Sequence, residues 1–143
     1  MVLNRMLAIV AAALIFLTGS ATAHSPPESA VVFFVNLKDG ATVTSPLKVA
    51  FGIKDFGVTT AGDNAKRKHV AGHHHLLIDL EQLPQMDEPL PYSNNIVHYD
   101  QGETDTTLEL PPGQHTLQLL LADEDHEPHE PPLLSKKITI TVK

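Results

Sequence analysis

Hydrophobic residues occur in short runs separated by Gly, Pro and polar residues, and none of the runs has the period of an amphipathic helix. Runs of four to eight apolar or alternating residues between turn-forming residues are typical of β-strands. Seven such strands are predicted, at residues 31–36, 47–53, 73–80, 96–99, 106–110, 115–122 and 136–142. Seven short strands without a helix predict an all-β fold, an immunoglobulin-like antiparallel β-sandwich of about seven strands.

The start of the chain has a different character. Arg5 precedes an apolar run at residues 6–17, and Ala21-Thr22-Ala23 forms a small-residue cleavage site. This pattern predicts a secretory signal peptide, and its apolar run is short for a membrane span. We therefore expect a periplasmic or secreted protein with no membrane span after signal cleavage. The expected parts are a cleaved signal peptide at 1–23, a flexible leader at 24–30 and one β-sandwich domain at 31–143.

The amino-acid composition limits the possible partners and metal ligands of the protein. The formal net charge is −7, which argues against nucleic acid as a partner, because phosphate binding needs clustered Lys and Arg. The chain has no Cys, so disulfides and thiolate metal sites are excluded and imidazole and carboxylate remain as the strong ligands. Nine histidines in 143 residues are the outlier. The histidines are therefore the first candidates for a functional site.

Three of these histidines are consecutive, in the segment GHHHLLID. Side chains alternate across a strand, so His73 and His75 project from one face and His74 from the other, together with Leu76 and Ile78. Two imidazoles that point the same way from a rigid strand are a compact beginning for a metal site. His74 is expected to be structural.

Strand pairing indicates which other histidines join them. In an immunoglobulin-like sandwich the third and sixth strands are neighbours. Antiparallel pairing places the start of one beside the end of the other, so the triplet is expected near the acidic loop at residues 123–132. His115, at the start of its strand, is expected at the far end. The predicted metal ligands are His73, His75, His126 and His129, with His98 as an additional ligand.

An imidazole shell without thiolate favours a copper or zinc ion. Asp123, Asp125 or Glu127 is expected to accept the second ring N–H of a ligand and so orient it. Metal affinity is expected to fall as histidine protonates below about pH 6.5.

The remaining candidates have structural interpretations. His115 is expected to be a strand-edge residue, His69 a solvated loop residue, and Asp79 a residue that accepts from a local backbone donor or ends its strand. His24 has two interpretations. If cleavage follows Ala23, its α-amine and imidazole together can chelate Cu²⁺ as a histidine brace; the favoured alternative is a frayed N-terminus.

Residues 31–143 resemble an uncharacterised family of small exported bacterial β-sandwich domains. The resemblance is carried by VFFVNLKDGATVTSPLKVAFG, GHHHLLID, LPPGQHTLQLLLAD, DEDHEPHEPP and KKITITV. It implies a fold and a cellular location rather than an activity. The family pattern has histidines at the positions of His73, His74, His75, His98, His115, His126 and His129. A looser resemblance, to periplasmic immunoglobulin-like copper carriers, rests on His24, the turn at residues 38–41 and Asp125-His126.

Three functions remain open. The favoured one is a periplasmic metal-binding protein, a carrier, chaperone or buffer for copper or zinc that passes its ion to a periplasmic or envelope protein. The second is a metal-free β-sandwich module that binds a protein or cell-envelope ligand. The third is a small metalloenzyme, for which the sequence offers no support: it contains neither an H-E-x-x-H motif nor a nucleophile elbow.

Overall fold

The computed structural model describes residues 25–63 and 70–143. The predicted signal peptide, His24 and His69 lie outside these residues. The described chain forms ten β-strands: β1 Val31–Phe34, β2 Thr42–Val43, β3 Leu47–Lys54, β4 Gly57–Val58, β5 Ala71–Ile78, β6 Ile96–His98, β7 Asp105–Leu108, β8 Gly113–Ala122, β9 Pro128–Leu134 and β10 Ile138–Val142. No helix in the described ranges has the length and hydrophobicity that a membrane span requires.

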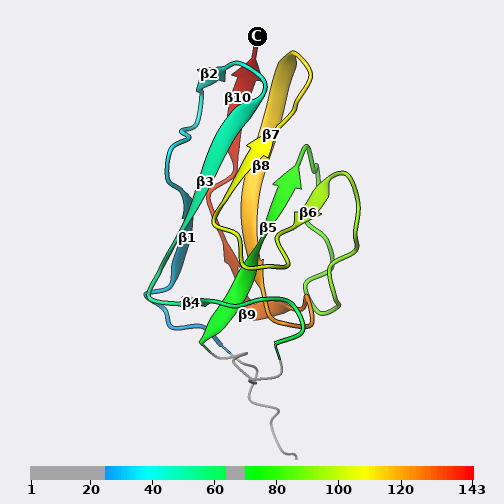
Figure 1. Ribbon diagram of the computed structural model, residues 1–143. Helices are drawn as coiled ribbons and strands as arrows, with labels where there is room; N and C mark the ends of the chain where they lie inside the picture. The colour runs from blue at the N-terminus through cyan, green and yellow to red at the C-terminus, as the bar shows by residue number, and fades with distance from the viewer. Residues whose placement is uncertain (1–24, 64–69) are drawn as a thin grey trace, which may run out of the picture.

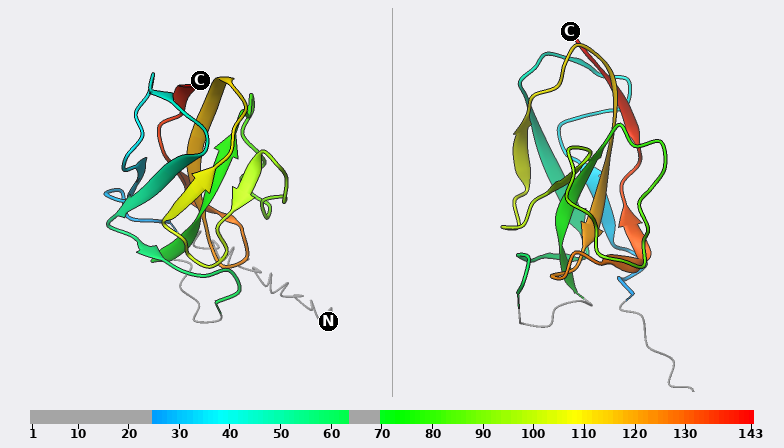
Figure 2. Two further views of the ribbon diagram at one scale, coloured as in Figure 1. Left: turned by 45° about the horizontal axis from the view of Figure 1, so that its top comes forward. Right: turned by 90° about the vertical axis from the view of Figure 1, so that its right-hand side faces the viewer.

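The strands form two sheets that pack face to face (Figures 1 and 2). The smaller sheet has the order β1-β3-β7. The larger, seven-stranded sheet follows the path β2-β10-β8-β5-β4, with β6 paired to β5 and β9 paired to β8. Most neighbours are antiparallel, and only the short pairs β2–β10 and β4–β5 among these strands are parallel. The predicted β-sandwich is therefore confirmed.

All seven strands predicted from the sequence are present, with ends that differ by at most two residues. Strands β2, β4 and β9 were not predicted. The expectation of a loop throughout residues 123–132 was wrong, because β9 begins at Pro128. Its prolines suggested a loop, but β9 pairs with only the end of β8, through three residue pairs and an irregular register. Proline is tolerated in such an edge strand because few of its N–H groups are needed for pairing.

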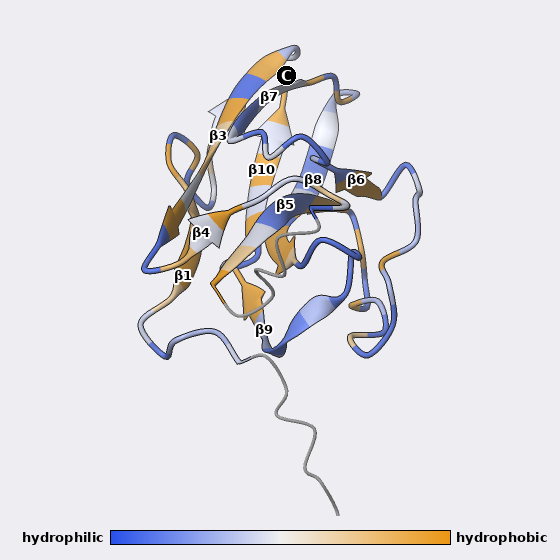
Figure 3. Cartoon of the chain, turned by 60° about the horizontal axis from the view of Figure 1, so that its bottom comes forward, coloured by the Kyte–Doolittle hydropathy of each residue, from blue (hydrophilic) through white to orange (hydrophobic). Residues whose placement is uncertain are grey.

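The main hydrophobic core lies between the sheets. Alternate residues of β3, β8 and β10 point into it, and Figure 3 shows this alternation along β10, where Ile138, Ile140 and Val142 are buried. β5 contributes Leu76, and His74 lies on the same face with its ring centroid 5.3 Å from that of Phe51. His74 therefore belongs to the core, as the alternation predicted.

Strand β5 is buried on both faces. This is unusual, because a strand of a β-sandwich commonly has one face on the core and the other in solvent. Its outer face is covered by the connection to β6, residues 79–95, and carries a second apolar cluster. That cluster consists of Leu77, Leu90, Ile96, Leu120 and Ala122. His73 and His75 share the Leu77 face, so the covering connection encloses them as well.

Candidate metal centre

The register between β5 and β8 places the histidine triplet beside the turn that follows β8. His73 is opposite Ala122, the last residue of β8, and His75 is opposite Leu120. In Figure 1, β5 starts at the lower end of the molecule, near the β8–β9 turn and away from the C-terminus. The predicted pairing of these strands is confirmed. It brings residues about 50 positions apart in the sequence to one edge of the sheet.

The turn between β8 and β9 orients the side chain of His126 toward the histidine triplet. Asp123 organises this turn: its Oδ1 accepts the backbone N–H groups of Asp125, at 2.8 Å, and Glu127, at 3.0 Å. His126 has a left-handed backbone with φ of 66°, a conformation that few non-glycine residues adopt. Its carbonyl accepts the N–H of Leu90 at 2.9 Å, which ties the turn to the segment that covers β5. The turn is therefore anchored at both sides of the imidazole.

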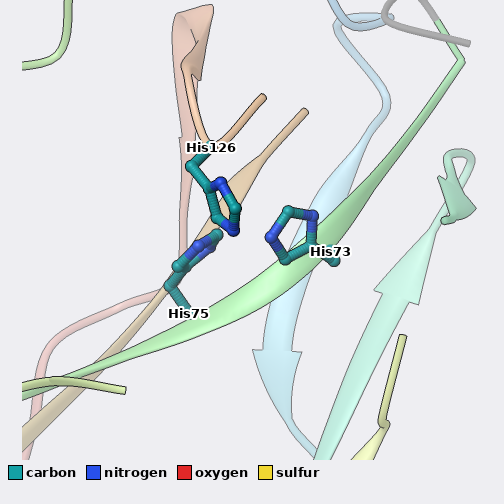
Figure 4. A group of neighbouring side chains, drawn as sticks. All are labelled: His73, His75 and His126. Atoms are coloured by element: carbon teal, nitrogen blue, oxygen red, sulfur yellow. The ribbon is translucent and has the colours of Figure 1, made fainter. Parts of the chain in front are cut away.

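Three imidazoles converge at this point (Figure 4). The ring centroid of His73 lies 4.5 Å from that of His75 and 4.9 Å from that of His126, and the latter two are 5.7 Å apart. One ring nitrogen from each lies within 4.8 Å of the others. Figure 4 shows the rings of His73 and His75 rising from β5 and the ring of His126 turned toward them from the loop. The three rings surround a common space.

The two histidines from β5 are fully buried, and neither ring nitrogen of either has a hydrogen-bond partner in the described part of the chain. A neutral imidazole has one donor and one acceptor, and a buried polar group without a partner costs about 1–3 kcal/mol. Folded proteins satisfy nearly all such groups. One nitrogen from each of these two rings belongs to the group that converges with His126, and this combination of unsatisfied burial and convergence calls for a ligand.

His98 and Asp100 extend the cluster from β6 and the turn after it. His98 lies opposite His75 across the β5–β6 pair. Its Nε2 is 3.1 Å from the Pro91 carbonyl and its Nδ1 is 3.8 Å from Asp100 Oδ1. The same oxygen lies 3.1 Å from His126 Nε2. His98, Asp100 and His126 thus form a second group of ligand atoms within 4.8 Å of one another.

Sequence reasoning missed Asp100. The sequence predicts acids of the β8–β9 turn beside the imidazoles, and the structure adds a carboxylate from the β6–β7 connection, Asp100, whose Oδ1 lies 3.1 Å from His126 Nε2. The available signal was the spacing His98-Tyr99-Asp100, because residues two apart in an extended segment point the same way. Tyr99 points instead to the core, 4.8 Å from Phe51 between ring centroids.

Tyr92 covers the cluster on its solvent side. Its ring stacks on His98 at a centroid distance of 3.8 Å and an interplanar angle of 14°. Its hydroxyl lies 2.9 Å from Asp100 Oδ2 and 3.2 Å from His126 Nε2, while the residue itself is 68% exposed. Tyr92 lies in the connection over β5, which has no periodic pattern, so no sequence signal pointed to it.

Burial sets the protonation of this cluster. It lowers the pKa of His73 to about 4, with a further contribution from His126, and that of His75 to about 2, with a further contribution from His73. Burial also lowers the pKa of His98. These imidazoles are therefore neutral at pH 7 and offer lone pairs. Burial alone raises the pKa of Asp100, but hydrogen bonds from His126 and Tyr92 outweigh it and bring the pKa below its ordinary value. The cluster thus pairs neutral imidazoles with an ionised carboxylate.

His129, the fifth predicted ligand, lies on the other face of the sheet. Its ring is 5.0 Å from that of Phe56, between centroids. Its Nε2 is 2.8 Å from the position that a Cβ on Gly72 would take, and Gly72 faces away from His73. The structure therefore brings together His73, His75, His98 and His126 and leaves His129 apart. The reason is that β9 begins between His126 and His129, so the turn orients the first and the strand orients the second.

His115 lies at the far end of β8, as predicted. Its Nδ1 is 2.7 Å from Asp79 Oδ2 and its Nε2 is 2.9 Å from the Pro111 carbonyl. Asp79 Oδ1 also accepts the N–H of Thr116 at 2.8 Å, just after β5 ends. Asp79 thus follows the end of β5, as one of its two interpretations had it, but its backbone donor is Thr116 of β8 rather than a local one.

A sequence model of the family described as Domain of unknown function (DUF4399) matches residues 49–143. The chain belongs to the DUF4399 family. This confirms the expected membership in an uncharacterised family, and the DUF4399 region contains every residue of the cluster described above. Comparisons with curated proteins and with solved structures found no match.

Proposed function

We propose that the protein binds a copper or zinc ion at the cluster of His73, His75 and His126 and serves as a carrier, chaperone or buffer for it. One observation carries this proposal: two fully buried imidazoles, without hydrogen-bond partners among residues 25–63 and 70–143, face a third imidazole from a distant segment. A metal ion would bind a nitrogen of each ring and so offset the cost of burying them unsatisfied.

The geometry is compatible with an ion after a small adjustment. Metal–nitrogen bonds of 2.0–2.1 Å in a tetrahedral shell place the nitrogens about 3.3 Å apart, whereas here they lie within 4.8 Å of one another. His98 borders the space between the three rings, and we retain it as an additional ligand of the ion. His129 lies on the other face of the sheet and is not part of the proposed site.

The proposed location and the proposed recipient of the ion are supported by the sequence. The pattern of residues 1–23 supports export to the periplasm, where a protein that receives the ion would be the partner. The looser resemblance to copper carriers supports copper as one of the two candidates. Its first element, His24, lies outside the described residues.

The test is metal analysis of the mature protein purified without a histidine tag. We expect about one equivalent of Zn²⁺ or Cu²⁺ by elemental analysis and by calorimetric titration. His73→Ala and His126→Ala should each lose most of this binding. His115→Ala is the matched control, because it removes an imidazole at the far end of β8 and should retain the ion. A wild-type protein that binds neither ion, or equal binding by all three variants and the wild type, would overturn the proposal.

A further inference from the structure

We infer that the centre takes a divalent cation in a mixed shell of imidazole nitrogen and carboxylate oxygen, with Asp100 as the oxygen ligand and Tyr92 as the residue that positions it. The inference rests on the proposed function. It adds a ligand that is not a histidine, and it selects divalent ions over Cu⁺.

A single oxygen of Asp100 faces three of the imidazoles. Its Oδ1 lies 3.1 Å from His126 Nε2 and 3.8 Å from both His73 Nε2 and His98 Nδ1. This atom therefore occupies the place where the two groups of potential ligand atoms meet. Zinc–carboxylate bonds are about 2.0–2.2 Å long, similar to those with imidazole. An ion between His73 and His126 would thus have Asp100 Oδ1 beside it as a carboxylate ligand.

The charge of this oxygen favours a divalent ion. Neutral imidazoles alone would leave the full charge of the ion beside the buried rings of His73 and His75, where charges are less well screened than in water. One carboxylate offsets a unit of that charge, and Asp oxygen is an established ligand of Zn²⁺ beside histidine. Cu⁺ prefers soft sulfur ligands, and Met86, the single methionine in the described residues, packs against the apolar cluster at Leu77 and Leu90.

Tyr92 fixes the orientation of the carboxylate. Its hydroxyl donates to Asp100 Oδ2 at 2.9 Å, which leaves Oδ1 directed at the imidazoles. Binding of an ion would replace the hydrogen bond between His126 and Oδ1, while the bond from Tyr92 to Oδ2 is unaffected. The stacking of Tyr92 on His98 holds the phenol in this position. Tyr92 is therefore a positioning residue at the solvent side of the centre.

Two variants test the inference. Asp100→Asn keeps the shape of the side chain and removes its charge, and Tyr92→Phe removes only the hydroxyl. The affinities of wild type and variants for Zn²⁺, Cu²⁺ and, under anaerobic conditions, Cu⁺ are measured by competition with chromophoric chelators. We expect the wild type to prefer the divalent ions. Asp100→Asn should weaken divalent binding by about 10–100-fold and leave Cu⁺ binding unchanged, so the ratio of the two affinities shifts.

The second readout is the electron paramagnetic resonance spectrum of the Cu²⁺ form. Asp100→Asn should change the copper hyperfine coupling because an anionic oxygen ligand is lost. Tyr92→Phe should lower divalent affinity by a smaller factor, about threefold to tenfold, with an unchanged urea midpoint because the residue is mostly exposed. Asp100→Ser provides the same test if the Asn variant does not fold.

The two failures are distinguishable. A wild-type protein that binds no ion overturns the proposed function. A wild type that binds Zn²⁺ or Cu²⁺, while Asp100→Asn binds it equally well with an unchanged spectrum, overturns this inference alone. Tighter binding of Cu⁺ than of either divalent ion would also overturn it.

Discussion

His75 and His98 lie directly opposite each other on β5 and β6, with their ring centroids 4.4 Å apart. The Pro91 carbonyl, 3.1 Å away, can only accept, so His98 carries its proton on Nε2 and directs the lone pair of Nδ1 toward the cluster. A carbonyl that accepts one ring N–H in this way orients the other ring nitrogen toward a metal ion. His75 is therefore a ligand in the centre of the proposed site, and His98 is a ligand at its border.

The first prediction concerns this border position. We expect His98→Gln to weaken Zn²⁺ binding by about 10–100-fold. His75→Gln should abolish it, because the ring nitrogens of His75 have no hydrogen-bond partner within the described part of the chain. Calorimetric titration of the two variants beside the wild type measures the difference. Binding by His98→Gln at wild-type affinity would show that His98 lines the site without binding the ion.

The second prediction concerns acid stability of the metal-free protein. Burial lowers the pKa of His73 and of His74 to about 4, and an unfolded histidine has its ordinary value of 6.5. Between these values the unfolded state binds more protons, so stability is present above pH 6.5 and is lost as the pH falls toward 4. Each such proton contributes about 1.4 kcal/mol per pH unit.

The matched variant for this test is His74→Leu, which replaces a buried imidazole in the core beside Phe51. We expect it to lower the pH dependence of the unfolding free energy by up to one proton and to leave metal binding unchanged. Urea unfolding with a chelator present, at about pH 7, 5.5 and 4.5, measures the slope. An identical slope in the variant and the wild type would contradict the assignment to His74.

The third prediction concerns the close approach at Gly72. A Cβ there would lie 2.5 Å from the Ala122 carbonyl oxygen and 2.8 Å from His129 Nε2. Because the first contact is with backbone, Gly72→Ala should force β5 and β8 apart and destabilise the fold by about 3 kcal/mol. Metal affinity should fall as well, since His73 is the next residue.

Gly40→Ala is the comparison for this substitution. Gly40 has a left-handed φ of 77°, and no atom of the described residues lies within 4 Å of the position that its Cβ would take. Its replacement should cost only the conformational term, about 1 kcal/mol, without an effect on metal binding. Equal losses of stability in both variants, measured by urea unfolding, would show that crowding at Gly72 is relieved by a small shift of the strands.

The fourth prediction concerns the contact between His115 and Asp79. The hydrogen bond from His115 to this carboxylate raises the pKa of the imidazole, and the Pro111 carbonyl accepts from the other nitrogen. A raised folded-state pKa contributes stability that is fully present below pH 6.5 and is lost as the pH rises through the folded-state value. His115→Gln should therefore cost about 1 kcal/mol at acidic pH, a figure reduced by the exposure of Asp79, and less at alkaline pH.

Thermal or urea unfolding of His115→Gln across this pH range checks the sign of the effect. The opposite trend, with a larger cost at alkaline pH, would contradict a charged pair. Metal binding by the same variant should equal that of the wild type, because the residue lies at the far end of β8 from the cluster.

The sequence by itself determined seven of the ten strands of the described chain and the direction of the histidine triplet. Both follow from local rules, since alternation along a strand separates His74 from its neighbours whatever the strand packs against. The sequence also predicted that the triplet lies close to the β8–β9 turn, because antiparallel pairing of two long apolar strands has few alternatives.

Only the tertiary structure decided the remaining members of the cluster. His126 and His129 are three residues apart in a proline-rich segment, and they separate because β9 pairs with the end of β8 just between them. Asp100 and Tyr92 reach the imidazoles from connections whose paths depend on what they cover. Such positions follow from long-range packing rather than from any local pattern, because irregular segments take their conformation from the surfaces on which they fold.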